Sequence, residues 1–188
     1  NKHQILEADI NVWEQKIREL VQSSEDMMQE GHFDGNNIKS ETKKLQNQFK
    51  ALKDPISKRC AALDESLKFH RFTFEVETEL QWINERLPVA ISEAMGQNLY
   101  QAQSMEKKHK KLQAEILGHE SMINKTLAIG QNLIEQKHPE KSNIESSCKN
   151  LEEEWNNLQS KADERARKLE LSLKAQQYLS DVGEIETW

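Results

Sequence analysis

The stretch "VETELQWI" at residues 76–83 ends in Trp82 and Ile83, and a similar phrase, "VGEIETW" at residues 182–188, closes the chain. The two tryptophans, Trp82 and Trp188, are 106 positions apart in a chain of 188 residues. A sequence motif that recurs at a fixed offset is typical of a protein built from internal repeats. The first question for this sequence is therefore whether the offset holds elsewhere.

The offset of 106 aligns the rest of the chain with itself without an insertion or deletion. Identical pairs include His3 and His109, Leu6 and Leu112, Ala8 and Ala114, Ile10 and Ile116, Ile17 and Ile123, His32 and His138, Leu45 and Leu151, Leu52 and Leu158, Arg59 and Arg165, and Leu63 and Leu169. Aromatic residues also align with aromatic residues, Phe49 with Trp155 and Phe72 with Tyr178. The chain is a tandem array.

Within each repeat, apolar residues recur in alternating steps of three and four. One such series is Leu6, Ile10, Trp13, Ile17, Leu20, Ser24 and Met27, and another is Ile144, Cys148, Leu151, Trp155, Leu158, Ala162, Arg165 and Leu169. This spacing predicts helices that pack along a heptad seam with a left-handed supercoil. Polar members of each series weaken any single seam, which favours a local bundle over a long two-stranded zipper.

Breaker residues divide the helices. The segments "EGHFDGNN" (30–37), "SEAMGQN" (92–98) and "KHPEKS" (137–142) carry Gly, Pro, Asn and Ser, which end helices. Residues 64–80 contain neither Gly nor Pro, so one helix is predicted to run from one unit into the next. Pro55 is expected to kink its helix or to mark a first turn.

The predicted fold is all-α, with tandem three-helix left-handed coiled-coil bundles joined by a continuous helix. One unit consists of helix A (about 70–91), helix B (about 98–136) and helix C (about 141–171). Residues 1–69 then supply helices B and C of a first repeat without its helix A. Residues 70–172 form a complete second repeat, and residues 173–188 begin helix A of a third.

The tryptophans could form a ligand cage, but all of them lie at seam or repeat-equivalent positions, which favours core packing. The residues predicted to form the core are Trp13, Phe49, Phe72, Trp82, Leu112, Ile116, Ile123, Leu151, Trp155 and Leu158.

Composition narrows the class of protein. Charged residues make up 31% and hydrophobic residues 36%, with 6 Gly and 3 Pro, as in a water-soluble, elongated helical chain. The longest apolar run, "LPVAI", is too short to span a membrane, and no signal peptide is readable at the N-terminus. The net charge of −6 argues against nucleic acid as a partner. Cys60 and Cys148 have no ligand spacing and are expected to be reduced thiols.

No catalytic motif stands out, so neither enzymatic activity nor a cofactor is expected. Histidines could suggest a metal site, but no paired ligand motif accompanies them. A part-buried histidine is the favoured interpretation for His3 and His109, and a capping or turn role for His32 and His138. Lys107, Lys108, Lys110 and Lys111 could bind an anionic surface, although their positions favour a solvated helix face.

A 106-residue three-helix unit with a tryptophan in helix A, an aromatic residue in helix C and an unbroken C-to-A junction is similar to the spectrin repeat. The phrases "EGHFDGNNIKSETKKL" (30–45), "RCAALDESL" (59–67) and "EKKHKKLQAEILGHE" (106–120) resemble spectrin itself more than its dystrophin, plakin or nesprin relatives, and its α chain more than its β chain. The sequence departs from the common pattern at Phe49, where many repeats have Trp, and at "FHRFTFEVE" (69–77).

This resemblance implies a structural rod segment of an actin-linked membrane skeleton, acting as an elastic spacer and a lateral-association scaffold. It implies a cytoplasmic location at the inner face of the membrane and side-by-side pairing of α and β spectrin chains. Actin and membrane-skeleton proteins would bind through other segments of the full chain, and no transmembrane segment is expected. The competing function is a protein-docking module in a plakin, dystrophin or nesprin relative, which would display an exposed apolar patch. A simple dimeric coiled coil is disfavoured by the recurring breaks.

Overall fold

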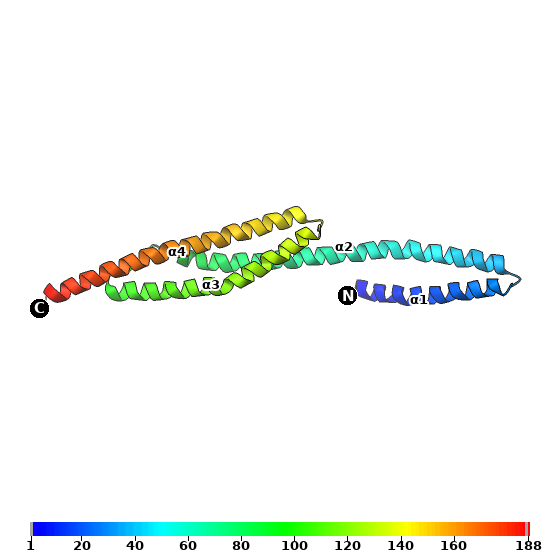
Figure 1. The fold of residues 1–188 in the computed structure, drawn as a ribbon, viewed down its shortest axis with the longest axis horizontal. Helices are drawn as coiled ribbons and strands as arrows, with labels where there is room; N and C mark the ends of the chain where they lie inside the picture. Colours follow the sequence, from blue (N-terminus) through cyan, green and yellow to red (C-terminus); the bar gives the residue numbers. More distant parts are fainter. Residues whose placement is uncertain (1, 187) are drawn as a thin grey trace. The chain divides into compact units, whose positions relative to one another are not determined.

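The computed structural model describes the backbone of residues 2–186 and 188 and the side chains of residues 5–186 and 188. These residues form four α-helices, α1 (Lys2–Gln29), α2 (Gly35–Ala90), α3 (Leu99–Glu135) and α4 (Lys141–Glu186), and no strand (Figure 1). The all-α prediction is confirmed. The helices are separated at the three breaker segments that the sequence indicates.

The helices belong to two compact units, Asn1–Leu67 and Lys68–Trp188. In the first unit, α1 and the first part of α2 lie side by side as a helical hairpin (Figure 1). In the second, α3 and α4 pack with the last part of α2. Helix α4 continues past Ser172 to Glu186 without a break, as is expected if one helix runs from one unit into the next, and the start of a third repeat at residue 173 stays a prediction.

Helix α2 has 56 residues and crosses from Leu67 to Lys68 without interruption, which confirms the predicted continuous helix. Residues 56–87 contain neither Gly nor Pro, so no side chain there interrupts the backbone hydrogen bonds. Pro55 lies inside α2 and does not end it. Its missing N–H leaves the carbonyl of Ala51 without its usual donor, and the helix continues on both sides.

Two equivalent turns end α1 and α3. After α1, Gly31 adopts a left-handed φ of 76°, and His32 N donates to Met27 O at 3.0 Å. At the position 106 residues on, Lys137 adopts a φ of 57°, and His138 N donates to Leu133 O at 3.1 Å. Both are Schellman turns, in which a left-handed residue closes the last turn of the helix.

The turn before α3 is held by a reciprocal cap. Asn98 Oδ1 accepts from Gln101 N, and Gln101 Oε1 accepts from Gln97 N, both at 2.9 Å. These bonds satisfy backbone donors that a helix start leaves without partners. Gly96 precedes them with a φ of 87°, and a Cβ there would lie 2.6 Å from the backbone nitrogen of Ala102. Only glycine fits at that position.

The hydrophobic core lies in the second unit. Its buried members are Phe72, Val76, Ile83 and Ala90 from α2, Leu112, Ile116, Ile123 and Leu133 from α3, and Ile144, Leu151, Trp155, Leu158 and Ala162 from α4. Seven of the ten predicted core residues are in this cluster, and Trp82 packs against it while remaining half-buried.

The first unit has no comparable core. Trp13 is 57% exposed, so its predicted core position is wrong for this hairpin, and Phe49 is only half-buried. Among the hydrophobic side chains described in this unit, Ile10 alone is buried. The physical reason is geometric, because two helices can cover only the line along which they touch.

Candidate functional site: the packing surfaces of the two units

In the second unit, the three helices meet at an aromatic layer built around Trp82. Its ring is stacked on the imidazole of His119, with ring centroids 3.8 Å apart and planes 2° from parallel. Trp155 lies 6.1 Å away in a tilted arrangement. Each ring comes from a different helix, so this layer fixes the register of α2, α3 and α4 against one another.

Charged side chains complete this layer. His119 Nε2 donates to the buried carboxylate of Glu79, which provides a partner for a charge that would otherwise be costly to bury. The Arg86 guanidinium lies 3.9 Å from the Trp82 ring centroid, and Arg86 Nε lies 3.5 Å from Glu115 Oε2. The pairs of His119 with Glu79 and of Arg86 with Glu115 join α2 to α3, so these contacts have a structural role.

A second polar cluster lies nearer the turn between α2 and α3. His109 is buried and donates from Nε2 to Ala162 O at 2.7 Å. Burial lowers the pKa of His109, the hydrogen bond to Ala162 raises it, and the positive charge of Arg165 lowers it further. His109 is therefore held in its neutral form in the core.

Arg165 and Ser172 tie α4 to the same turn. Arg165 Nη2 donates to Ala94 O at 3.3 Å, and Ser172 Oγ donates to Met95 O at 3.0 Å. Burial lowers the pKa of the Arg165 guanidinium. Both side chains satisfy carbonyls of a segment that has no helical hydrogen bonds of its own, which secures the end of α2.

The loop histidines act as predicted. His32 Nδ1 accepts from Asp34 N at 3.2 Å, and His138 Nδ1 accepts from Glu140 N at 3.0 Å. Each ring thus caps the turn before the following helix, so the capping role is confirmed. The side chain of His3 lies outside the described residues. Among the residues that are described, no group of His, Cys, Asp or Glu has the arrangement of a metal site.

The other candidate features have ordinary surroundings. The four lysines of residues 107–111 are exposed, with Lys110 paired to Glu106 at 2.7 Å and Lys111 to Glu115 at 3.8 Å, as on a solvated helix face. Cys148 is half-buried beside Gly130, and burial raises the pKa of its thiol, so the thiol acts as a small apolar side chain.

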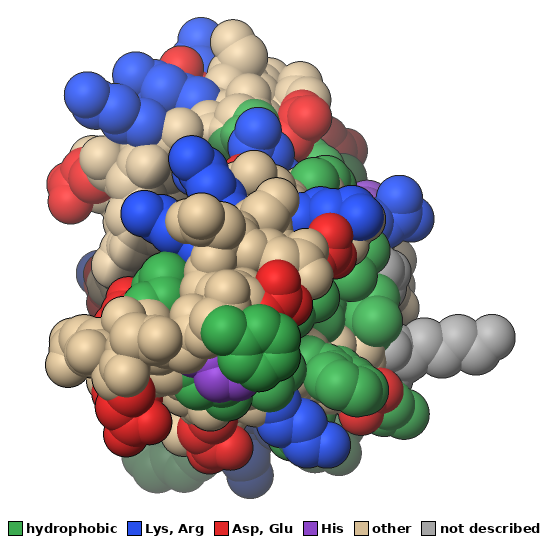
Figure 2. Space-filling model, turned by 90° about the vertical axis from the view of Figure 1, so that its right-hand side faces the viewer, with side chains coloured by type: hydrophobic (Ala, Val, Ile, Leu, Met, Phe, Trp, Pro, Cys, Tyr) green, Lys and Arg blue, Asp and Glu red, His purple; other side chains and the backbone are tan. Residues whose placement is uncertain are grey.

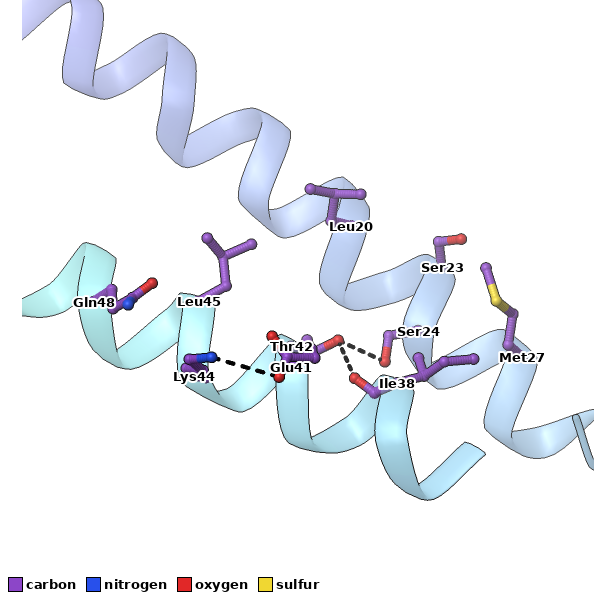
Figure 3. Close-up of a pocket in the computed structure, with 10 residues that line it drawn as sticks. All are labelled: Leu20, Ser23, Ser24, Met27, Ile38, Glu41, Thr42, Lys44, Leu45 and Gln48. Carbon is purple, nitrogen blue, oxygen red and sulfur yellow. Dashed lines mark hydrogen bonds and ion pairs between the residues drawn. The ribbon is translucent and has the colours of Figure 1, made fainter. Parts of the chain in front are cut away.

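The first unit contains an open groove instead of a core. One section, of about 500 Å³, lies between α1 and α2 and is lined by Leu20, Ser23, Ser24, Met27, Ile38, Glu41, Thr42, Lys44, Leu45 and Gln48 (Figure 3). A second section, of about 330 Å³, continues from Leu45 and Gln48 to Ile10, Trp13, Ile17, Phe49 and Leu52. We call these residues the hairpin groove.

A hydrogen bond and an ion pair join the two helices of the first unit. Thr42 Oγ1 donates to the hydroxyl of Ser24 at 3.0 Å, as Figure 3 shows. Lys53 Nζ lies 2.6 Å from Glu14 Oε2, and these side chains also join α1 to α2. Hydrogen bonding to Lys53 and Arg18 lowers the pKa of the Glu14 carboxyl. In the end-on view of Figure 2, hydrophobic side chains lie at the surface beside Lys and Arg side chains.

The hairpin groove occupies positions that are core positions in the second unit. By the 106-residue offset, Trp13 corresponds to His119 and Phe49 to Trp155, the two rings that contact Trp82. The remaining positions also correspond: Ile10, Ile17, Leu45 and Leu52 align with the core residues Ile116, Ile123, Leu151 and Leu158. The groove is therefore the surface that the last part of α2 covers in the second unit.

Sequence reasoning missed Glu79 and Arg86. Glu79 could have been found, because it falls on the helical series of Phe72, Val76 and Ile83, where a charged residue requires a buried partner. Arg86 carries no such signal, since a position four residues after Trp82 is also typical of a solvated arginine.

A tandem helical repeat in which one helix runs through both units, and in which the second unit packs aromatic residues from three helices together, defines the class of tandem three-helix repeat proteins. The spectrin repeat family model matches residues 1–65 and 67–171, and the chain belongs to this family. It is 29% identical over 187 residues to erythrocytic spectrin alpha chain 1 of Mus musculus and 30% identical over 187 residues to non-erythrocytic spectrin beta chain 5 of Homo sapiens, in both cases over 100% of this chain. It is 34% identical to the spectrin beta chain of Drosophila melanogaster over 140 residues, 74% of this chain.

The chain spans only 8%, 5% and 6% of the lengths of these three relatives, respectively. Identity to the alpha chain and to the beta chains is similar, so the preference for the α chain stays a prediction. No helix in the described part of the chain has the length and apolar character needed to cross a membrane.

Proposed function

We propose that this chain is a segment of a structural rod in an actin-linked membrane skeleton, where it acts as an elastic spacer. The observation that carries the proposal is α2, a single helix that belongs to both units. A helix shared by two units couples their unfolding, and repeats coupled in this way transmit load along an array. Membership of the spectrin repeat family and similarity to spectrin alpha and beta chains support the same role.

The proposal includes the partners and location that accompany such a role. The segment would pair side by side with a partner spectrin chain at the cytoplasmic face of the membrane. Actin and other membrane-skeleton proteins would bind through other segments of a longer chain. The exposed, ion-paired helix faces suit lateral contact, because they carry many charges of both signs.

The spacer function is tested at the shared helix with Leu67→Pro. Leu67 is exposed, so proline there interrupts the helix, at a cost of about 3 kcal/mol, without removing a core side chain. Urea unfolding would be followed separately in α1 and α3 by hydrogen exchange. The parent should lose both helices in one transition, and Leu67→Pro should separate the transitions.

Leu67→Ala is the matched control, because it removes the same side chain and keeps the backbone hydrogen bond. It should unfold as the parent does. Two separate transitions in the parent would contradict the spacer proposal. Lateral pairing is tested by using the chain to capture proteins from a membrane-skeleton extract, and failure to capture a spectrin chain would contradict that part.

The alternative function, a protein-docking module of a spectrin-repeat scaffold such as a plakin, dystrophin or nesprin relative, is favoured by one observation. The hairpin groove is lined largely by apolar side chains, as a surface that binds a helix of another protein would be. In the capture experiment, a protein other than spectrin that is retained by the parent and lost with Trp13→Glu would support this alternative.

A further inference from the structure

A cavity of about 160 Å³ lies between one face of α4 and the end of α2 with the turn that follows it. Every residue that lines it falls within residues 90–168. This range lies inside the second unit and inside the match of the family model to residues 67–171. The cavity is therefore formed by one unit alone and is separate from the hairpin groove.

Arg165 is the buried charged group of this cavity. Only 8% of the residue is exposed, and its side chain lines the cavity. Nη2 donates to Ala94 O at 3.3 Å, whereas Nε and Nη1 are buried without a hydrogen-bond partner among the described residues. A buried guanidinium is costly unless its charge and its donors are matched by an acceptor. Arg165 therefore has donors available for an anion.

The other charged side chains that line the cavity are Lys161, Lys168, Glu93 and Glu164. One carboxylate serves both lysines, because Glu164 Oε2 lies 3.2 Å from Lys161 Nζ and Glu164 Oε1 lies 2.6 Å from Lys168 Nζ. Together with Arg165, three basic and two acidic side chains line the cavity, a net charge of +1. The whole chain has a net charge of −6, so the cavity differs in sign from the rest of the molecule.

The internal repeat separates the role of Arg165 from that of the two lysines. At the offset of 106, Arg165 corresponds to Arg59, so both repeats have an arginine at this position. Lys168 corresponds to Ala62, and Lys161 corresponds to a proline. The arginine can be explained by its hydrogen bond to the turn, whereas the lysines are additional charges of the second unit.

We propose that this cavity binds a free phosphate group, as inorganic phosphate or as a small soluble phosphomonoester. Its oxygens accept charge-assisted hydrogen bonds from Arg165 and from the ammonium groups of Lys161 and Lys168. A phosphate has enough acceptor oxygens to contact all three cations at once, whereas chloride has one contact surface and no directional acceptor. Binding is a property of the second unit and does not rest on the proposed rod function.

The carboxylates beside the cavity favour a small ion over an anionic membrane. Glu93 and Glu164 are exposed, and both line the cavity. An extended anionic surface would have to approach these two charges, which repel it, whereas a small ion can enter between them. A soluble phosphate is therefore the source that the arrangement of charges favours.

Amide NMR spectra of the whole chain, titrated with sodium phosphate near neutral pH, test binding. Sodium chloride keeps the ionic strength constant. The signals of residues 92–96 and of Arg165 Nε–H should shift and saturate, with a dissociation constant on the order of 1 mM for a few charge-assisted hydrogen bonds. Shifts that do not saturate, or that chloride alone reproduces, would overturn the proposal.

Two exposed variants test the site without altering the core. Lys168→Gln removes a cation and should weaken phosphate binding about fivefold, and Glu164→Gln removes a carboxylate and should strengthen it by a similar factor. Lys174 and Glu170 are the matched control, because they form the same kind of ion pair on α4, at 2.7 Å, outside the cavity. Lys174→Gln and Glu170→Gln should bind as the parent does. Equal effects at both pairs would mean a response to overall charge and would overturn the site.

Arg165→Lys tests the buried donor. It keeps the positive charge and loses the guanidinium donors, so binding should weaken at least about tenfold. Circular dichroism shows whether this variant keeps its helix content, since Arg165 also binds the turn at Ala94. A folded Arg165→Lys that binds like the parent would overturn the assignment. If it unfolds, Lys168→Gln and Glu164→Gln decide the proposal, because their side chains are exposed.

Vesicles of phosphatidylcholine with phosphatidic acid present the same phosphomonoester on a membrane. The parent should not sediment with them, because the exposed carboxylates face the lipid surface. Sedimentation with these vesicles that Lys168→Gln abolishes, without a saturable response to free phosphate, would overturn the soluble ligand in favour of a lipid headgroup.

Discussion

The two units carry the same pattern and bury it to different extents. Leu158 in the second unit has no exposed surface, whereas Leu52, its equivalent in the first, is 58% exposed. His119 is stacked on a tryptophan, and its equivalent, Trp13, is exposed. A heptad seam thus specifies which residues are available for burial, and the number of helices around the seam specifies which are buried.

The largest difference between the units should come from shortening these equivalent leucines. Leu158→Ala removes side-chain atoms from an enclosed core and should destabilise the second unit by about 2–5 kcal/mol. Leu52→Ala should change the stability of the first unit by no more than about 0.5 kcal/mol, because solvent already surrounds the side chain. Urea unfolding of both variants, at concentrations where the chain is monomeric, makes the comparison. Equal losses would mean that the groove is covered.

A smaller difference is expected at Gly130 of α3, where a side chain would meet Cys148 of α4 and Phe72 of α2. A Cβ on Gly130 would meet Cys148 Sγ and lie 2.8 Å from Phe72 Cε2, so Gly130→Ala should cost about 1–3 kcal/mol. The equivalent residue of the first unit is Ser24, which already has a side chain there and accepts a hydrogen bond from Thr42. Ser24→Ala should cost about 0.5–1.5 kcal/mol. Thermal unfolding measures both, and a neutral Gly130→Ala would show that the helices can separate without cost.

The buried His109 should make the second unit sensitive to acid. Burial lowers its pKa in the folded state, so the unfolded chain binds more protons between that value and about 6.5. Above about pH 6.5, His109 is neutral in the folded and the unfolded chain, and its contribution to the free energy of unfolding is fully present. As the pH falls from there through the folded-state pKa, the unfolded chain takes up a proton first, and this contribution is lost by at most about 1.4 kcal/mol per pH unit. His109→Gln keeps a donor for Ala162 and cannot titrate, so its stability should fall less in acid. Parallel curves for variant and parent between pH 7 and pH 5 would exclude this role.

The smallest effect is expected at the two Schellman turns. Lys137 has a left-handed backbone that glycine adopts without strain, and its equivalent in the first unit is Gly31. Lys137→Gly should raise the stability of the second unit by about 0.5–1 kcal/mol, and Gly31→Lys should lower that of the first by a similar amount. Melting curves of the two exchanges should shift in opposite directions, and a loss of stability with Lys137→Gly would contradict the strain argument.

The helices and their breaks could be predicted because they depend on local chemistry. Gly31, Gly96 and Pro139 lie in the breaks, and the absence of Gly and Pro from residues 64–80 predicts the shared helix. Pro55 shows the limit of this reasoning, since α2 continues through it. A proline removes one hydrogen bond, and a helix with many others on both sides can persist.

The candidate sites were less predictable. The capping role of His32 and His138 follows from their place in equivalent turns, and the structure agrees. The contact of Arg86 with Trp82 depends on side-chain orientation, to which an amphipathic pattern is insensitive. The exposure of Trp13 was missed because periodicity identifies a face of a helix without saying what lies against it.

The sequence alone was sufficient to establish a tandem, all-helical repeat, the position of its breaks and the continuity of α2, because these depend on spacing and on the backbone chemistry of Gly and Pro. Tertiary packing was needed to distinguish a core from a groove. Ile17 and Ile123 occupy equivalent positions in equivalent helices, yet Ile123 is buried among three helices and Ile17 lines the open groove of a hairpin. The hydrophobic effect acts on the surface that neighbours remove from water, and a residue's own sequence context does not include those neighbours.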